Sequence, residues 1–198
     1  RVKRSMKYLL YTLGCKVNQY ESQQIRMILA SCGLTPAQDD EPYELSIVNT
    51  CSVTTTAASK ARQQIRRLSR GGTIPTIVVG CYADSDANTI RKIPGVIEVI
   101  GHHQNIFPSL RAVLSTRFDL PVLPSRGLSE PDPQAGPLLD RFTGHQRAFL
   151  KVQDGCDAWC SYCIIPQLRD TLWSKPIDEV VREARQLVEA GHREIVLT

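Results

Sequence analysis

The chain has 198 residues, and its 24 lysine and arginine residues outnumber its 20 aspartate and glutamate residues, which gives a formal net charge of +4 at pH 7. This balance permits contact with RNA but does not require it. No apolar run approaches the length of a membrane span, so we expect no membrane partner. The seven cysteines are an odd number, and no secretory leader is evident. We therefore expect a cytoplasmic protein whose cysteines bind metal or react rather than form disulfides.

Three apolar runs in the first eighty residues predict buried strands. The runs at 8–14, 45–50 and 77–80 have the length and β-branched content of such strands, and helical patterns lie between them. This alternation predicts a parallel sheet with helices on both faces. A further strand at 96–100 extends the pattern, so we expect one α/β domain over residues 6–116.

Each of the first three runs ends at a cysteine: Cys15, Cys51 and Cys81. Parallel sheets of this kind bind ligands at the carboxyl ends of their strands, so these three side chains can converge on one metal. On position alone, buried core cysteines at strand ends explain the pattern equally well.

A fourth cysteine belongs to a helical stripe. In the helix predicted at 19–32, Ile25, Ile28 and Leu29 recur with Cys32 at spacings of three and four residues. Such a stripe faces a core. We therefore expect Cys32 to be a small buried hydrophobic residue and not a ligand.

A basic stretch at 60–70 is the best candidate for a nucleic-acid contact. If it is helical throughout, Arg62, Arg66 and Arg70 lie on one side, four residues apart. A solvated helix face is the alternative to a surface that tracks RNA phosphates.

Three histidines have neither the spacing nor the partners of a metal site, and we expect them in surface loops: His102, His103 and His192.

Composition divides the rest of the chain. Residues 117–146 hold five prolines and no sustained periodicity, which predicts a semi-rigid linker rather than a packed element.

The pattern of residues 147–198 predicts a strand at 148–152, a helix at 176–190 and a strand at 194–197. We expect these elements to be the first βαβ unit of a barrel, with a functional loop beyond the carboxyl end of the first strand.

That loop contains a compact cysteine triplet, Cys156, Cys160 and Cys163. Three thiolates at these gaps can reach three irons of one cubane cluster and leave the fourth iron open to a ligand. A closed zinc site would want four ligands from two short pairs, and no second pair lies nearby. The alternative is three buried cysteines near a tight turn.

Four motifs together resemble the radical S-adenosylmethionine methylthiotransferase family. They are TLGCKVNQYES at 12–22, NTCSVT at 49–54, VGCYA at 79–83 and GCDAWCSYCIIP at 155–166. The resemblance implies two [4Fe-4S] clusters, S-adenosylmethionine as cosubstrate and methylthio transfer to an unactivated carbon. It assigns Cys15, Cys51 and Cys81 to an auxiliary cluster, and Cys156, Cys160 and Cys163 to the radical cluster.

The resemblance also implies a role for Tyr162, which would lie against the adenine of S-adenosylmethionine; simple packing is the alternative.

Two departures from the family pattern stand out. Arg169 is followed by Asp170 where the family usually has glycine, which changes what we expect of that loop. The chain also has too few residues after 146 for a complete barrel, so we expect an amino-terminal portion of a longer enzyme, inactive alone.

Residues just after Cys15 point to a substrate branch. The run Lys16-Val17-Asn18 looks like the branch that acts at carbon 2 of N6-threonylcarbamoyladenosine beside the tRNA anticodon. The alternatives within the family are isopentenyladenosine in tRNA and an aspartate of a ribosomal protein. A non-catalytic zinc or iron–sulfur module is the alternative of another class. The expected partners are tRNA and an electron donor such as flavodoxin or ferredoxin.

Overall fold

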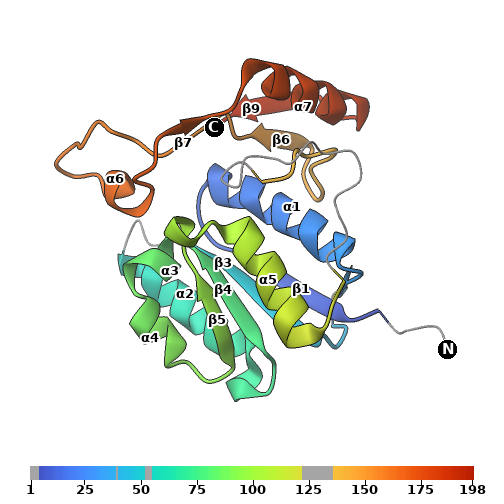
Figure 1. Ribbon diagram of the computed structural model, residues 1–198, viewed down its shortest axis with the longest axis vertical. Coiled ribbons are helices and arrows are strands. Elements are labelled where there is room, and N and C mark those ends of the chain that lie inside the picture. The colour runs from blue at the N-terminus through green and yellow to red at the C-terminus, as the bar shows by residue number, and fades with distance from the viewer. Residues whose placement is uncertain (1–4, 39, 52–54, 122–135) are drawn as a thin grey trace.

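The computed structural model describes residues 5–38, 40–51, 55–121 and 136–198. We call the described part before residue 122 the amino-terminal unit and the part from residue 136 the carboxy-terminal unit (Figure 1). The strands are β1 (Lys7–Thr12), β2 (Thr35–Pro36), β3 (Leu45–Thr50), β4 (Thr76–Gly80), β5 (Val96–Ile100), β6 (Arg147–Leu150), β7 (Gln153–Asp154), β8 (Trp173–Ser174) and β9 (Glu194–Leu197).

The helices surround these strands, and none of those described is long and apolar enough to cross a membrane. The α-helices are α1 (Lys16–Ser31), α2 (Thr55–Leu68), α3 (Cys81–Ser85), α4 (Ala87–Arg91), α5 (Ile106–Phe118), α6 (Ile165–Leu168) and α7 (Ile177–Glu189). Two short 3-10 turns complete the set: η1 (Arg70–Gly72) and η2 (His102–Gln104).

The amino-terminal unit is built on a five-stranded parallel sheet in the order β2-β1-β3-β4-β5. This confirms the predicted α/β class and its parallel sheet. The sequence does not predict β2, which has only two residues and is exposed at the sheet edge.

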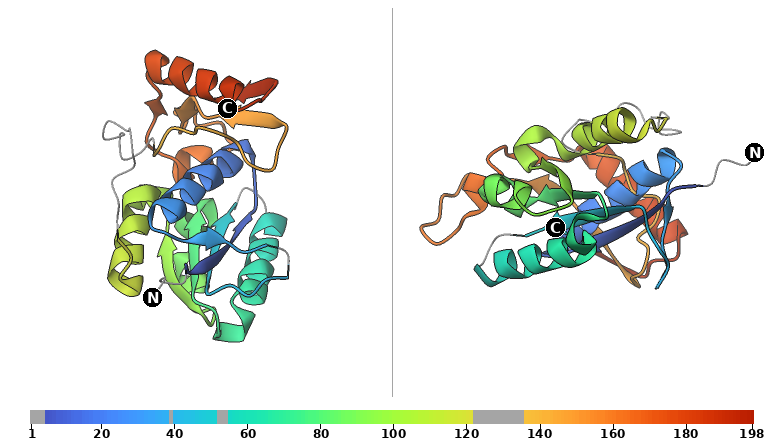
Figure 2. Two further views of the ribbon diagram at one scale, coloured as in Figure 1. Left: turned by 90° about the vertical axis from the view of Figure 1, so that its right-hand side faces the viewer. Right: turned by 90° about the horizontal axis from the view of Figure 1, so that it is seen from below.

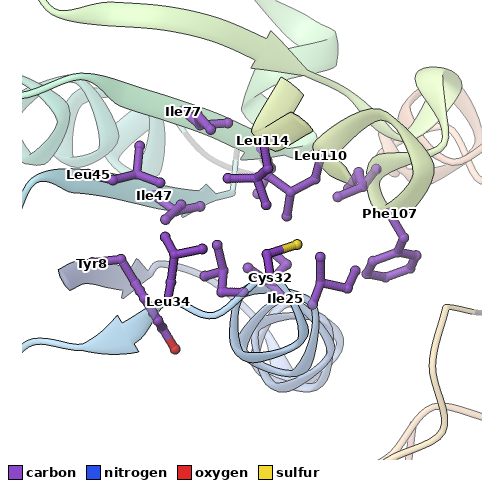
Figure 3. Packing of buried hydrophobic residues seen from close by; sticks show 14 of the residues in the cluster. Tyr8, Ile25, Cys32, Leu34, Leu45, Ile47, Ile77, Phe107, Leu110 and Leu114 are labelled. Carbon is purple, nitrogen blue, oxygen red and sulfur yellow. The ribbon is translucent and has the colours of Figure 1, made fainter. Parts of the chain in front are cut away.

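Successive residues of the central strands pack into two separate hydrophobic cores, one on each face of the sheet. Ile47 and Ile77 pack with α1 and α5 on one face, whereas Val48 and Val78 pack with α2, α3 and α4 on the other. Because successive strand residues point to opposite faces, a strand buried on both sides must be apolar throughout. Figure 3 shows the first core, where Cys32 lies among apolar side chains and is 1% exposed, as predicted.

The carboxy-terminal unit begins as a single βαβ crossover. β6 pairs in parallel with β9, and α7 connects them along the chain. β7 and β8 form a short antiparallel pair beside this crossover. The order strand, helix, strand agrees with the expected start of a barrel.

Helix α1 lies between the sheet and the carboxy-terminal unit (Figures 1 and 2). Its first face packs on the sheet through Ile25 and Leu29. Its opposite face contributes Tyr20, which is fully buried, to a third core with Leu150 and Leu187. One helix is therefore buried on two sides and joins the two units.

The segment from 136 to 146 differs from the expected semi-rigid linker, because it packs into the third core. Leu139 and Phe142 are buried in the third core, at 0% and 2% exposed. The side chain of Gln24 donates to the Pro137 carbonyl at 2.8 Å. His192, expected in a surface loop, accepts from the Phe142 amide at 3.0 Å. The three prolines Pro124, Pro131 and Pro133 lie outside the described residues.

This packing makes Phe142 a structural anchor. We expect Phe142→Ala to lower the free energy of unfolding by about 3 to 5 kcal/mol, because it empties a buried aromatic site in the third core. The neighbouring Arg141→Ala is the matched control, since that side chain is 71% exposed and should change stability by less than about 0.5 kcal/mol. Urea denaturation of both variants measures the difference, and equal midpoints would contradict the anchoring role.

Candidate functional site

Three cysteines gather at the carboxyl edge of the sheet. Cys15 follows β1, Cys51 follows β3 directly, and Cys81 begins α3 where β4 ends. β1, β3 and β4 are adjacent and parallel, so their carboxyl ends meet at one edge. Cys15 is exposed, whereas Cys51 and Cys81 are buried.

Two glycines permit this approach. A Cβ atom on Gly14, whose φ is +118°, would lie 2.7 Å from the Cβ of Cys51. A Cβ atom on Gly80, at φ +96°, would lie 2.5 Å from the carbonyl oxygen of Thr50. Neither distance is sterically possible, so each of these cysteine loops needs a glycine just before its cysteine.

An amide network holds the Cys15 loop against β3. Asn18 donates to the Thr50 carbonyl at 2.8 Å, and Asn49 donates to the Asn18 carbonyl at 2.9 Å. Both asparagines are fully buried. The Cys15 thiol donates to the Asn18 side-chain oxygen at 3.3 Å. Both asparagines lie in motifs that carry the family resemblance, but no local pattern predicts their positioning role, because each contacts a residue about thirty positions away.

Cys81 occupies a different environment from Cys15. Burial raises the pKa of the Cys81 thiol to about 11, while the nearby Arg169 guanidinium opposes that rise. A neutral thiol is thus the stable form in the free protein, and a bound metal would favour the thiolate.

The expectation that His102 is a surface-loop residue is wrong. Its side chain is 12% exposed, and its Nε2 lies 3.6 Å from the Cys81 sulfur. Burial lowers the pKa of this imidazole, despite the nearby Glu21 carboxylate. No sequence signal marked His102, because the contact depends on the pairing of β4 with β5.

The second cysteine triplet lies in the loop after β7. Cys156 and Cys163 are partly buried and Cys160 is exposed, so the alternative of three buried cysteines is wrong. The Cys163 amide donates to the Cys160 carbonyl at 2.9 Å and closes a turn within the triplet. Tyr162 is 91% exposed, so its ring does not pack within the described part of the chain.

A buried charge cluster joins the two units beside both triplets. Arg169, just after α6, donates to both oxygens of Glu21 on α1, at 2.9 and 3.2 Å. The same guanidinium donates to Asp154 at 2.7 Å, and Lys151 donates to Asp154 at 3.0 Å. Burial disfavours the charged form of both acids, but these cations outweigh it and lower the pKa of Glu21 and, further, of Asp154.

This cluster borders a cavity of about 290 Å³ lined by both units. Among the described residues, only Glu21, His102 and Asp154 bring three possible ligand atoms within 4.8 Å of one another. The carboxylates of Glu21 and Asp154 are already neutralised by Arg169 and Lys151, so this trio is a poor cation site.

Asp170 stands where the family usually has glycine. Its carboxylate lies 3.3 Å from Nδ1 of His103, so it forms a contact between the two units.

A second buried cluster links α1 to α7. The Tyr20 hydroxyl donates to Glu183 at 2.7 Å and accepts from Lys175 at 2.9 Å. Lys175 also pairs with Glu183, which accepts from the Leu139 amide at 2.9 Å. Two adjacent residues of α1 thus contact different polar clusters of the carboxy-terminal unit: Tyr20 contacts Lys175 and Glu183, and Glu21 contacts Arg169.

The basic stretch does not form a single arginine face. Helix α2 ends at Leu68, so Arg70 lies beyond it in η1 and stacks over Tyr43, 5.0 Å from the ring centre. Arg62 donates to the Tyr82 hydroxyl at 2.8 Å. Arg66 is exposed on α2. Two of the three side chains are therefore engaged within the protein.

Sequence comparison places this arrangement among known proteins. The family model described as "Uncharacterized protein family UPF0004" matches residues 7–101. Over 95% of its length, the chain is 37% identical to the threonylcarbamoyladenosine tRNA methylthiotransferase MtaB of Bacillus subtilis (strain 168). Over most of its length, the chain is therefore similar to the amino-terminal part of tRNA methylthiotransferases.

Other relatives carry two different substrate names. The chain is 34% identical over 96% of its length to the protein named MtaB from Chlamydia pneumoniae. It is 35% identical over 94% of its length to a tRNA-2-methylthio-N(6)-dimethylallyladenosine synthase of Sphingopyxis alaskensis. In each of these three relatives the match spans 42% of the relative's length.

The Glu21–Arg169–Asp154 cluster gives a stability prediction. Arg169→Gln leaves two buried carboxylates short of a partner, so we expect it to lower the free energy of unfolding by about 3 to 5 kcal/mol. The control is Arg147→Gln, which breaks the ion pair with Glu194 at 2.8 Å between half-exposed side chains and should cost less than about 1 kcal/mol. Chemical denaturation compares the two variants, and an Arg169→Gln effect no larger than that of Arg147→Gln would refute the prediction.

Proposed function

We propose that this chain is part of a tRNA-modifying methylthiotransferase that uses radical S-adenosylmethionine chemistry in the cytoplasm. Its reaction adds a methylthio group at carbon 2 of N6-threonylcarbamoyladenosine beside the anticodon. The observation that carries the proposal is that Cys15, Cys51 and Cys81 follow the carboxyl ends of three adjacent parallel strands at one edge of the sheet. The family relationship supports the same reaction class.

The residues at the sheet edge suit an iron–sulfur cluster with one open iron. Cys15, Cys51 and Cys81 offer three soft sulfur ligands, the type that iron–sulfur clusters take. They come from three adjacent strand ends and leave a fourth position without a cysteine. We assign them to an auxiliary [4Fe-4S] cluster.

The loop after β7 suits a second [4Fe-4S] cluster. Cys156, Cys160 and Cys163 lie within eight residues, and the turn between the last two brings their backbones together. Iron–sulfur and S-adenosylmethionine cofactors supply the radicals needed to replace a ring hydrogen that no side-chain base can remove. The exposed Tyr162 ring is free to lie against the adenine of S-adenosylmethionine. The electron donor would be a protein such as flavodoxin or ferredoxin.

The choice of threonylcarbamoyladenosine rests on the residues after Cys15. Lys16 is exposed at the start of α1, beside Cys15. The threonylcarbamoyl group carries a carboxylate, which a nearby ammonium group would attract. Isopentenyladenosine has no such charge and is the second candidate substrate. The ribosomal-protein aspartate and a non-catalytic metal-binding module remain as less favoured alternatives.

The ligand assignment predicts iron content. After anaerobic reconstitution, the chain should bind about eight irons and eight sulfides, and Cys51→Ala or Cys160→Ala should each remove about half. Cys32→Ala is the matched control, because this cysteine belongs to the core and should keep the full content. Colorimetric iron and sulfide analysis measures the outcome. Loss of iron in Cys32→Ala with retention in Cys51→Ala would overturn the assignment.

The substrate proposal predicts a change in tRNA. Deletion of the gene should abolish the 2-methylthio form of N6-threonylcarbamoyladenosine in cellular tRNA and leave the isopentenyl derivative unchanged. Mass analysis of tRNA nucleosides from cells with and without the gene is the measurement. Loss of the isopentenyl derivative alone would establish the second candidate, and no change in tRNA would reject both.

A further inference from the structure

The auxiliary cluster proposed above has a fourth neighbour that is not a cysteine. β5 lies next to β4 in the sheet, and the first side chain beyond its carboxyl end, after Gly101, is His102. Four adjacent strand ends therefore present three thiols and one imidazole at the same edge.

The backbone of His102 is held by a side chain of α3, the helix that begins at Cys81. Asp84, three residues after Cys81, accepts from the His102 amide at 2.8 Å. The Asp84 carboxylate packs so closely on Gly101 that a Cβ atom there would lie 1.7 Å from its oxygen. The start of η2 is thus tied to α3, and α3 begins at Cys81.

The two nitrogens of the imidazole have different neighbours, and only Nε2 lies within hydrogen-bond distance of its neighbour. Nε2 lies 3.6 Å from the Cys81 sulfur, and Nδ1 lies 3.9 Å from a Glu21 oxygen. Glu21 is itself held by the two donors of Arg169, so it cannot swing away freely. The ring therefore presents its Nε2 to one sulfur of the cysteine set.

We propose that His102 donates a hydrogen bond from Nε2 to the Cys81 sulfur and thereby raises the reduction potential of the auxiliary cluster. Hydrogen bonds to the sulfurs of a cluster are among the determinants of its potential, because they stabilise the more negative, reduced form. Cys15 has a different partner, since its thiol donates to the side-chain oxygen of Asn18. His102 is a positioning and tuning residue that acts through Cys81. This inference rests on the proposed cluster at Cys15, Cys51 and Cys81.

The test uses the chain with Cys156, Cys160 and Cys163 all changed to alanine, so that one cluster remains. His102→Asn shortens the side chain and removes the donor at Nε2, whereas His102→Gln places an amide N–H near that position. The control is His103→Asn in the same turn, because His103 is more exposed and faces Asp170. Each variant is reconstituted anaerobically and titrated with dithionite and redox mediators, with the reduced cluster followed by electron paramagnetic resonance.

We expect His102→Asn to shift the midpoint reduction potential of the cluster to a more negative value. The midpoint potentials of His102→Gln and His103→Asn should stay near that of the parent. Equal midpoints in all four proteins would overturn the role of His102 and leave the cluster assignment intact. If the parent binds no cluster, the assignment of Cys15, Cys51 and Cys81 is wrong, and the inference is wrong with it.

The contact can also be tested without iron. In the metal-free chain labelled with ¹⁵N-histidine, Cys81→Ala should move the Nε2 resonance of His102 and leave that of His145 unchanged. His145 is a suitable reference because its ring makes an edge contact with Phe142 in the carboxy-terminal unit. An unchanged His102 resonance would show that the imidazole does not contact this sulfur and would overturn the proposal.

Discussion

The structure depends on a helix that is buried on two opposite sides. α1 packs its apolar stripe on the sheet and its other face on the carboxy-terminal unit. The second face carries Tyr20 and Glu21, whose polar groups would be costly to bury without partners. Lys175 and Arg169 supply those partners from the far side. Tyr20 and Glu21 both need hydrogen-bond partners once they are buried, and this need therefore sets how the two units meet.

This meeting places the residues that follow the second cysteine loop beside Cys81. Arg169 follows the loop of Cys156 to Cys163 and also lies close enough to Cys81 to oppose the rise of its pKa. The carboxyl edge of the sheet and the second cysteine loop therefore share a charged boundary. The buried ion pairs of Arg169 with Glu21 and Asp154 join the two units at this boundary.

Two sequence-based expectations failed for the same reason. His102 was expected in a surface loop, yet it contacts Cys81 because β5 pairs beside β4. The segment 136–146 was expected to be a spacer, yet Leu139 and Phe142 complete a core with α1 and β6. In both cases the deciding partner lies far away in the sequence. Composition and local spacing contain no information about such a partner.

The sequence by itself determined the α/β class, the strands that end in cysteines, the core position of Cys32 and the separate cysteine loop. These follow from hydrophobic periodicity and from ligand spacing, which are local properties of the chain. Only the tertiary structure decided that Glu21, Arg169 and Asp154 form one buried cluster and that His102 reaches Cys81. Those contacts join residues separated by up to 148 positions, and the cost of burying charge is what selects them.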